Sequence, residues 1–386
     1  MSNYTKFVGL DVHKKDIVVA LKIVGEEKKI EFKVSHTDKG LKKLLRKLKG
    51  HGLEKMLSCY EAGFCGFSLW RKLEKLGLDC KVIAPSLIPI KPGERIKTDK
   101  RDAKKLADLL SADLLTEVHP ISEEEESVRA LTRSRASVIK DIHRAKHRVL
   151  KFLHKLGIVW DGKSNWTQAH WLWLKSLQLD GLSQVVIDDL LLAIEQLEER
   201  CKNLEVGIQD VSEKEPYKKR VDWLKCFRGI DTITAMTIIT ELYSFERFHS
   251  PRQLMSYVGL VPSESSSGDR ENRGNITKAG NKHLRKILIQ TAQHCAKRPA
   301  IGKTLQGRRK GQPARVIAIA DKAMSRLYRK FLRLTVKYNK HRNKGIVAVA
   351  RELLGFIWAV LYPDCCDDPL SGEKETLLQT NNKKMY

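Results

Sequence analysis

The order of secondary-structure patterns in the first 114 residues constrains the fold most strongly. Three β-rich runs, FVGL, DIVVALKIV and KIEFKV, are separated by the short polar stretches HKK and GEEK, which is typical of an antiparallel meander. Two amphipathic helix patterns, LKKLLRKLKG and GFSLWRKLEKLG, then alternate with the strand patterns KMLSCY and DCKVIA. Thr98 can cap a further helix that begins DKRDAKKLADLL. This βββαβαβα order predicts an α/β domain of the ribonuclease H type.

The rest of the chain has mainly helical patterns. Leu and Ile recur at spacings of three and four over residues 123–212, which predicts long paired helices or a coiled coil. Within this region, WDGKSNWTQAHWLWL carries four tryptophans, which we interpret as packing residues in preference to a base-stacking surface. Farther on, WLKCFRGIDTITAMTIITEL has the layout of a DNA-binding helix-hairpin-helix. Asp231 in its turn would repel a phosphate, so a packing hairpin is an equal alternative.

Together these patterns predict four parts. They are an α/β domain at 1–114, a helical coiled-coil region at 115–215, a mainly helical C-terminal domain with a serine-containing loop and basic helices at 216–361, and a disordered polar tail at 362–386. The sequence has no apolar run long enough to span a membrane and no amino-terminal signal pattern. The eight cysteines show no metal-binding spacing, so we expect reduced thiols in a cytoplasm.

The charge of the chain points to a polyanionic partner. Lys and Arg total 72 against 46 Asp and Glu, a formal net charge of +26. The run from Arg270 to Lys344 is especially basic, because its acidic residues are Glu271 and Asp321 alone. Nucleic acid is therefore the expected partner. The basic residues chosen as candidate nucleic-acid contacts are Arg270, Arg273, Lys278, Lys282, Arg285, Arg308, Arg309 and Lys310.

Four carboxylates lie at informative places in the predicted α/β domain. Asp11 ends the first strand pattern, Glu61 follows the fourth, and Asp99 and Asp102 lie one helical turn apart. If the first and fourth strands are neighbours, Asp11 and Glu61 emerge side by side. Clustered acids repel one another unless a cation neutralises them, so we predict a site for Mg²⁺ or Mn²⁺ suited to phosphoryl transfer. The alternative is that each acid only complements a helix dipole or starts a turn.

Histidines near these patterns carry weaker signals. His143 and His147 are four residues apart on a basic helix, but no acid or third ligand lies nearby, so we expect a solvated or core role. His13 follows the first strand directly and either approaches the metal site or occupies the turn. Its role is left open.

A serine-rich stretch, PSESSSGDRENRGNITKAGN at residues 262–281, has two interpretations. Ser, Gly, Asp and Asn commonly form loops, so composition alone makes it a loop. A hydroxyl close to Arg270, Arg273 and Lys278 is also suited to meet a phosphate and attack it. The residues by themselves leave both interpretations open.

Five stretches of the sequence resemble a known family. GLDVHK, CYEAG, KTDKRDAKKLA and the downstream SYVGLVPSESSSG and GNITKAGNKHLRKIL are similar to the signature blocks of DEDD transposases of bacterial insertion sequences, the IS-one-ten type. The resemblance implies a RuvC-like domain with four catalytic, metal-binding acids, a coiled-coil segment, and a C-terminal transposase domain with a catalytic serine. Matched by motif, the acids are Asp11, Glu61, Asp99 and Asp102.

The same resemblance implies the nucleophile and the partners. The serine before glycine in SSSG is Ser267, and Ser266 is the nearest competitor. Phe64 after YEAG departs from the small polar residue more common in the family, which leaves Glu61 in place. The implied activity is recombination of donor and target DNA through a phosphoserine-linked strand, guided by a structured bridge RNA. We also expect a homo-oligomer, either a dimer or a tetramer.

Two other functions compete with this expectation. The first is a metal-dependent RuvC-like nuclease or junction resolvase in which water attacks the phosphate. The second is a nucleic-acid-binding protein without catalysis. A covalent link between protein and DNA separates the recombinase from the nuclease, and metal-dependent cleavage separates both from the binding protein.

Overall fold

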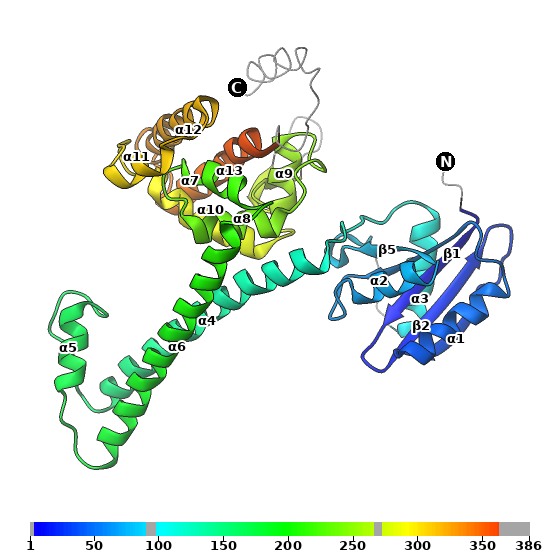
Figure 1. Cartoon of the computed structure of the whole chain (residues 1–386), viewed down its shortest axis with the longest axis horizontal. Helices are drawn as coiled ribbons and strands as arrows, with labels where there is room; N and C mark the ends of the chain where they lie inside the picture. Colours follow the sequence, from blue (N-terminus) through cyan, green and yellow to red (C-terminus); the bar gives the residue numbers. More distant parts are fainter. Residues whose placement is uncertain (1–3, 90–97, 266–271, 363–386) are drawn as a thin grey trace. The chain divides into compact units, whose positions relative to one another are not determined.

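The computed structural model describes residues 4–89, 98–265 and 272–362 (Figure 1). The chain divides into two compact units, Met1–Ser122 and Glu123–Tyr386. Residues of the expected coiled-coil region and C-terminal domain therefore fall mostly within one unit, while the finer division at 114 and 215 stays a prediction. The expected disordered tail lies almost wholly outside the described residues.

The first unit is a five-stranded mixed sheet with helices. Its elements are β1 (Lys6–Val12), β2 (Asp16–Ile23), β3 (Ile30–Ser35), α1 (Asp38–Lys49), β4 (Met56–Glu61), α2 (Ser68–Lys75), β5 (Asp79–Ile83), η1 (Pro85–Leu87) and α3 (Asp99–Ser111). The strand order is β3-β2-β1-β4-β5. β1 pairs antiparallel with β2 and parallel with β4. The predicted βββαβαβα order is confirmed, and so is the expectation that the first and fourth strands are neighbours.

Helix α3 lies against β1 because the sequence removes a side chain at the crossing point. A Cβ added at Gly9 would lie 2.1 Å from the Ala103 carbonyl oxygen of α3, a distance that no real Cβ contact reaches. The amino-terminal end of α3 is defined by Thr98, whose side chain accepts a hydrogen bond from the Arg101 N–H, as the sequence predicted. The close approach at Gly9 fixes where the first turn of α3 lies relative to β1.

The second unit begins with two long helices that run antiparallel (Figure 1). They are α4 (Glu123–Lys155) and α6 (Leu182–Ser212), and the short α5 (Gln168–Ser176) lies between them in sequence. Ala145 and Val149 of α4 are buried in a cluster with Ile194 of α6. The predicted pairing of long helices is confirmed.

The tryptophan segment packs around one histidine. His170 is fully buried, and its ring contacts those of Trp160, Trp166 and Trp173, while Trp166 also contacts Trp171. The Trp166 N–H donates a hydrogen bond to His170 Nδ1. These contacts agree with the packing interpretation of the segment.

The remaining elements form a helical module with its own core. They are α7 (Lys218–Lys225), α8 (Thr232–Leu242), α9 (Pro251–Val258), β6 (Pro262–Glu264), β7 (Arg273–Ile276), α10 (Lys282–Cys295), α11 (Lys303–Arg309), α12 (Ala314–Leu332), η2 (Arg333–Lys337) and α13 (Arg342–Leu361). Apolar residues of α13, among them Ile346, Val349 and Leu353, are buried at the centre of this core. Within the described ranges, no helix is both long and apolar enough to cross a lipid bilayer.

The turn between α7 and α8 favours packing over phosphate binding. The Asp231 side chain accepts a hydrogen bond from the Thr234 N–H and so caps α8. A carboxylate therefore occupies the helix end at which a phosphate would otherwise bind. Of the two interpretations of this hairpin, the packing hairpin fits the geometry.

Candidate active site

Strand pairing brings two of the predicted acids to one edge of the sheet. The parallel register of β1 and β4 pairs Leu10 with Tyr60, so Asp11 and Glu61 are the next residues along the two strands. Side chains alternate between the faces of a strand. Asp11 therefore shares a face with Gly9, which contacts α3, and Glu61 shares one with Cys59, whose thiol donates to the Leu106 carbonyl of α3. Both carboxylates belong to the sheet face that α3 covers.

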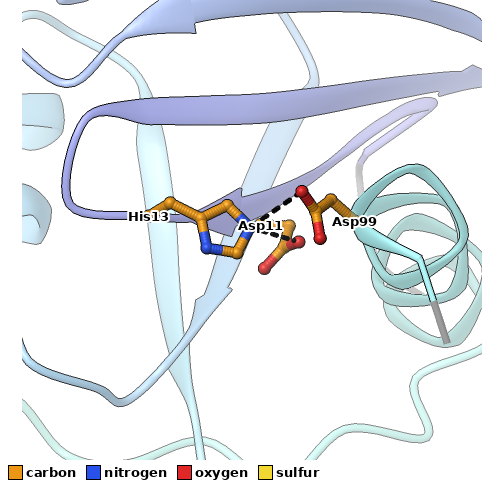
Figure 2. Close-up of side chains that lie close together, drawn as sticks. All are labelled: Asp11, His13 and Asp99. Atoms are coloured by element: carbon orange, nitrogen blue, oxygen red, sulfur yellow. Dashed lines mark hydrogen bonds and ion pairs between the residues drawn. The ribbon is translucent and has the colours of Figure 1, made fainter.

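The first turn of α3 supplies the other two acids. Asp99 and Asp102 both lie in that turn. Figure 2 shows the carboxylates of Asp11 and Asp99 next to each other, with the His13 ring on one side and its nitrogen joined by dashed lines to both. His13 Nε2 lies 3.1 Å from Asp11 Oδ2 and 3.4 Å from Asp99 Oδ2. One ligand atom from each of these three residues lies within 4.8 Å of the others.

The electrostatics of the cluster agree with its geometry. Burial raises the pKa of the Asp11 carboxyl, and the charges of Asp102 and Asp99 raise it further, against a lowering by His13. Asp102 therefore acts on Asp11 through its charge, although it lies outside the three-residue group. Glu61 is exposed at the end of β4 and also lies outside that group. Three of the four predicted acids thus interact directly or electrostatically, while the fourth is placed by strand register.

His13, whose role the sequence left open, lies beside the acids. The ring of His36 bonds the His13 carbonyl at 2.9 Å, which ties the β1–β2 turn to the end of β3. His13 is brought to Asp11 because the two residues are separated by one position at the end of a strand. This i, i+2 spacing was the only available signal in the sequence.

The donor set fits a divalent cation. Carboxylate oxygens from Asp11 and Asp99 are the hard ligands that Mg²⁺ and Mn²⁺ prefer, and the His13 nitrogen is a ligand tolerated by Mn²⁺. Burial first, and then the charges of Asp102 and Asp99, raise the pKa of Asp11, and a bound cation would offset both. Residues from β1, the following turn and the start of α3 could therefore hold a metal together.

Comparison with known proteins identifies the family. Residues 8–158 match the DEDD-type IS110 transposase family, and residues 222–306 match the family described as "Transposase IS116/IS110/IS902 family". A putative transposase of Sinorhizobium fredii is 36% identical over 92% of this chain and 88% of its own length. The transposase for insertion sequence element IS1533 of Leptospira borgpetersenii is 36% identical over 86% of this chain and 98% of its own. The chain belongs to the IS110 family.

This IS110-family protein is therefore an insertion-sequence transposase, an enzyme of DNA recombination. The transposase for IS1111A of Coxiella burnetii is a more distant relative, 25% identical over 58% of this chain and 61% of its own. The first family match spans the sheet with its acids and reaches the end of α4, and the second covers the helical module from α7 to the start of α11, on both sides of the serine stretch. Membership of a DEDD family implies an acidic site for a divalent metal.

The serine stretch of the transposase is only partly within the described residues. Ser267, Ser266 and Arg270 lie outside them. On either side, β6 and β7 pair antiparallel, and the Ser265 N–H donates to the Asn272 carbonyl at 2.9 Å. β6 and β7 therefore form a short β-hairpin within the serine-rich stretch, while the loop expected around Ser266 and Ser267 lies outside the described residues and stays a prediction.

The predicted nucleic-acid contacts of the transposase fall into two groups. Lys278, Lys282 and Lys310 are exposed and available to phosphates. Arg273 lies in β7. Arg285 donates to the Val258 and Ala279 carbonyls, so its guanidinium holds the turn before α10.

Two further arginines are used mainly inside the fold. Arg308 donates to the Ile230 carbonyl. Arg309 is only 7% exposed, donates to the Cys226 carbonyl and pairs with Asp321 at 2.7 Å. A guanidinium buried in this way cannot reach a phosphate on the surface. The expectation that Arg309 contacts nucleic acid is therefore corrected: its guanidinium is used within the helical module instead.

A buried carboxylate in the helical module escaped the sequence analysis. The Glu241 side chain, 1% exposed, accepts both arms of the Arg133 guanidinium at 2.7 and 2.8 Å. Asn281 Nδ2 donates to the same carboxylate at 2.5 Å, while its oxygen caps α10. Burial raises the pKa of Glu241, but these hydrogen bonds outweigh it and leave the pKa below its usual value. Glu241 thus joins α4, α8 and α10.

Proposed function

We propose that this transposase cuts and rejoins DNA through a divalent-metal acidic site and a serine nucleophile. The metal ligands are Asp11, Glu61, Asp99 and Asp102, and the metal is Mg²⁺ or Mn²⁺. The single observation that carries the proposal is that Asp11, near the end of β1 where it pairs in parallel with β4, lies close to Asp99 of α3. The charge of Asp102 also acts on Asp11 there. The order β3-β2-β1-β4-β5, with β2 alone antiparallel to both of its neighbours, supports a RuvC-like ribonuclease H fold.

The protein residues have separate roles in this reaction. A bound divalent cation would lower the charge on the scissile phosphate and stabilise the departing oxygen. Asp11, Asp99 and Asp102 hold and orient the site, and the crowding that raises the pKa of Asp11 favours cation binding. His13, hydrogen-bonded to Asp11, keeps that carboxylate in place.

Ser267 is the proposed nucleophile, acting on the same phosphate. Its oxygen forms a bond to phosphorus, the bond from phosphorus to the departing strand breaks, and that strand leaves as an alcohol after taking up a proton. A second strand end then attacks the phosphoserine and releases the serine. The bond energy is retained throughout, so rejoining needs no external cofactor.

The proposal includes partners beyond the donor and target DNA. A structured bridge RNA guides the choice of DNA, and the active form is a homo-oligomer, a dimer or tetramer, in the bacterial cytoplasm. The strongly basic chain and the exposed Lys278, Lys282 and Lys310 support binding of both nucleic acids. Sequencing the nucleic acid that copurifies with the protein tests this part. If no RNA encoded beside the transposase gene is recovered, the proposal that an RNA guides the enzyme is contradicted.

A covalent adduct is the decisive test of the nucleophile. The protein is incubated with labelled DNA, run on a denaturing gel, and any adduct is mapped to a peptide. Ser267→Ala should keep DNA binding and form no adduct, whereas Ser265→Ala, next to β6, should behave like the unaltered protein. An adduct that maps to Ser266 moves the nucleophile by one residue. Efficient cleavage without any adduct in the unaltered protein supports a nuclease that uses water.

A further inference from the structure

The cations of α4 divide into two sets according to whether carboxylates neutralise them. Arg133 pairs with Glu241, Arg135 with Glu205 at 2.6 Å, and Lys146 with Glu198 at 2.7 Å. These pairs join α4 to α8 and to α6. Their charge is compensated within the protein and is not available to a partner.

A second set lies along the opposite, exposed side of the same helix. We call it the outer stripe, and its members are Lys140, Arg144, His147, Arg148, Lys151 and Lys155. Their spacings of three and four residues place them on one face. The buried residues Val138, Ile142, Ala145, Val149 and Leu153 recur at the same spacings on the other face. At 1.5 Å per residue, the stripe is about 22 Å long.

The outer stripe is almost free of neutralising carboxylates. Among the described residues, Arg144 alone of the set has a carboxylate within ion-pair distance, that of Asp141 at 3.0 Å. Arg144, His147, Arg148 and Lys151 line a shallow hollow on this face. Four cationic or titratable side chains in one hollow repel one another, so they favour an anionic partner.

The antiparallel partner helix carries the opposite charge. The exposed acids of α6 are Asp188, Asp189, Glu195, Glu199 and Asp210. Apart from Arg200 and Lys202 of α6, the exposed Lys and Arg of the helical pair lie on α4, whereas most of its exposed acids lie on α6. A solvated surface needs no such separation, whereas a surface that binds a polyanion does.

We propose that the outer stripe of α4 is a nucleic-acid-binding surface that contacts the phosphate backbone. One strand of a duplex has a phosphate about every 3.4 Å of helix axis, so a stripe of about 22 Å covers a length that holds about six phosphates of each strand. Lys and Arg without an aromatic side chain among them position a backbone and do not read bases. This surface is additional to the one around Lys278 and Lys282, and it does not depend on Ser267 or on a metal.

A second copy of the chain is a poorer occupant of this face. Interfaces between proteins have an apolar core that is depleted of charged residues, whereas the outer stripe contains none but basic side chains. A nucleic acid has phosphates of the opposite charge and needs no apolar core at this face.

Salt dependence of binding tests the proposal. Two double variants are compared. The α4 variant carries Arg148→Gln and Lys151→Gln. The α6 variant carries Arg200→Gln and Lys202→Gln, which removes the same charge from the exposed side of α6. Both pairs are made in Ser267→Ala protein without divalent metal, so that no strand chemistry contributes. Binding of a fluorescent 25-base-pair DNA duplex, and of an RNA duplex of equal length, is measured by anisotropy at several NaCl concentrations.

The two double variants should differ clearly. Loss of two phosphate contacts should lower the slope of log K against log salt by about 1.8 for duplex DNA in the α4 variant. The α6 variant should keep the slope of the parent, and both should keep its melting temperature, since all four residues are exposed. The duplex that shows the loss identifies whether DNA or RNA occupies the stripe.

The proposal is overturned if the salt slope of the α4 variant equals that of the parent for both duplexes. It is also overturned if the α4 and α6 variants lose the same amount of slope. An unchanged slope together with a change in sedimentation of the nucleic-acid-free protein would make the stripe a contact between copies. None of these results bears on adduct formation by Ser267, so the two proposals fail independently.

Discussion

The two units of the transposase shift the pKa of a carboxylate in opposite directions. At the sheet edge, Asp11 is crowded by Asp99 and Asp102, and burial and repulsion raise its pKa. In the helical module, Glu241 is more deeply buried, yet Arg133 and Asn281 hold its pKa below the usual value. Burial alone therefore does not decide the state of an acid in this chain. The charges and donors around it do.

On the function proposed above, Asp11 is an acid kept for chemistry and Glu241 one kept for structure. An acid whose charged form is disfavoured by burial and by like charges opposes folding and is found mainly where function requires it. A bidentate arginine and an amide compensate the other charge fully and join three helices. Substitution of the first should affect activity more than stability, and substitution of the second should do the reverse.

The largest expected effect is on activity at the sheet edge. Asp11→Ala should lower strand exchange by at least about 100-fold, because even a residue that only supports a metal ligand costs 10- to 100-fold. Nucleic-acid binding should remain, since the basic surfaces are untouched. Strand exchange is measured on plasmid substrates with Asp38→Asn, an exposed acid paired with Lys72, as the control. Full activity in Asp11→Ala would refute the metal site.

The next effect is on stability in the helical module. Glu241→Ala should destabilise the protein by about 1–3 kcal/mol, because it leaves the Asn281 amide and the partly exposed Arg133 guanidinium without their partner. Urea unfolding followed by circular dichroism measures the loss. Glu195→Ala, an exposed acid of α6 paired with Lys175, is the matched control and should cost less than about 1 kcal/mol. Equal losses in the two variants would show that Glu241 is not a structural acid.

A pH series sharpens the contrast through its sign. Because the folded pKa of Glu241 is lowered, its stabilisation is complete above its usual value of 4.5 and is lost as pH falls through the folded pKa. The difference in unfolding free energy between the parent and Glu241→Gln should therefore shrink only below pH 4.5. Urea unfolding between pH 7 and pH 3 measures it. A difference that grows on acidification has the wrong sign for a paired carboxylate.

The smallest effect concerns a third kind of acid. Asp231 caps α8, so Asp231→Ala should cost about 0.5–2 kcal/mol of stability. DNA affinity should not decrease, because the carboxylate repels phosphates. Thermal unfolding and anisotropy test both statements, with Asp231→Asn as the variant that keeps the cap without the charge. A marked loss of DNA affinity in Asp231→Ala would restore the helix-hairpin-helix interpretation of this turn.

Much of the first unit could be predicted because its signals are local. Strand alternation, glycine at helix ends and the Thr98 cap depend on neighbouring residues, and the structure confirms the element order that they predicted. The placement of Asp11 and Glu61 at strand ends also followed from pattern. Their proximity needed the additional assumption that β1 and β4 are neighbours, which the parallel pairing confirms.

Other features could not be predicted because they depend on contacts between distant residues. Arg309 belongs to a basic stretch in the sequence, but Asp321 and the Cys226 carbonyl hold it inside the fold. Glu241 follows a run of apolar and hydroxyl-bearing residues, and nothing near it in sequence announces Arg133, 108 residues away. Charged residues can be counted from a sequence, whereas the neutralisation of each charge depends on which distant residues the fold brings into contact with it.

The sequence by itself determined the order of the elements in the first unit, the pairing of the long helices, the basic character of the chain and its resemblance to DEDD transposases, since these follow from composition, periodicity and motif. Only the tertiary structure decided which charges are free and which are compensated. It placed His13 beside Asp11 and Asp99, buried Arg309 and Glu241, and left the outer stripe of α4 exposed. The physical reason is that the energy of a charge depends on its distance from other charges and from water, and those distances are set by folding.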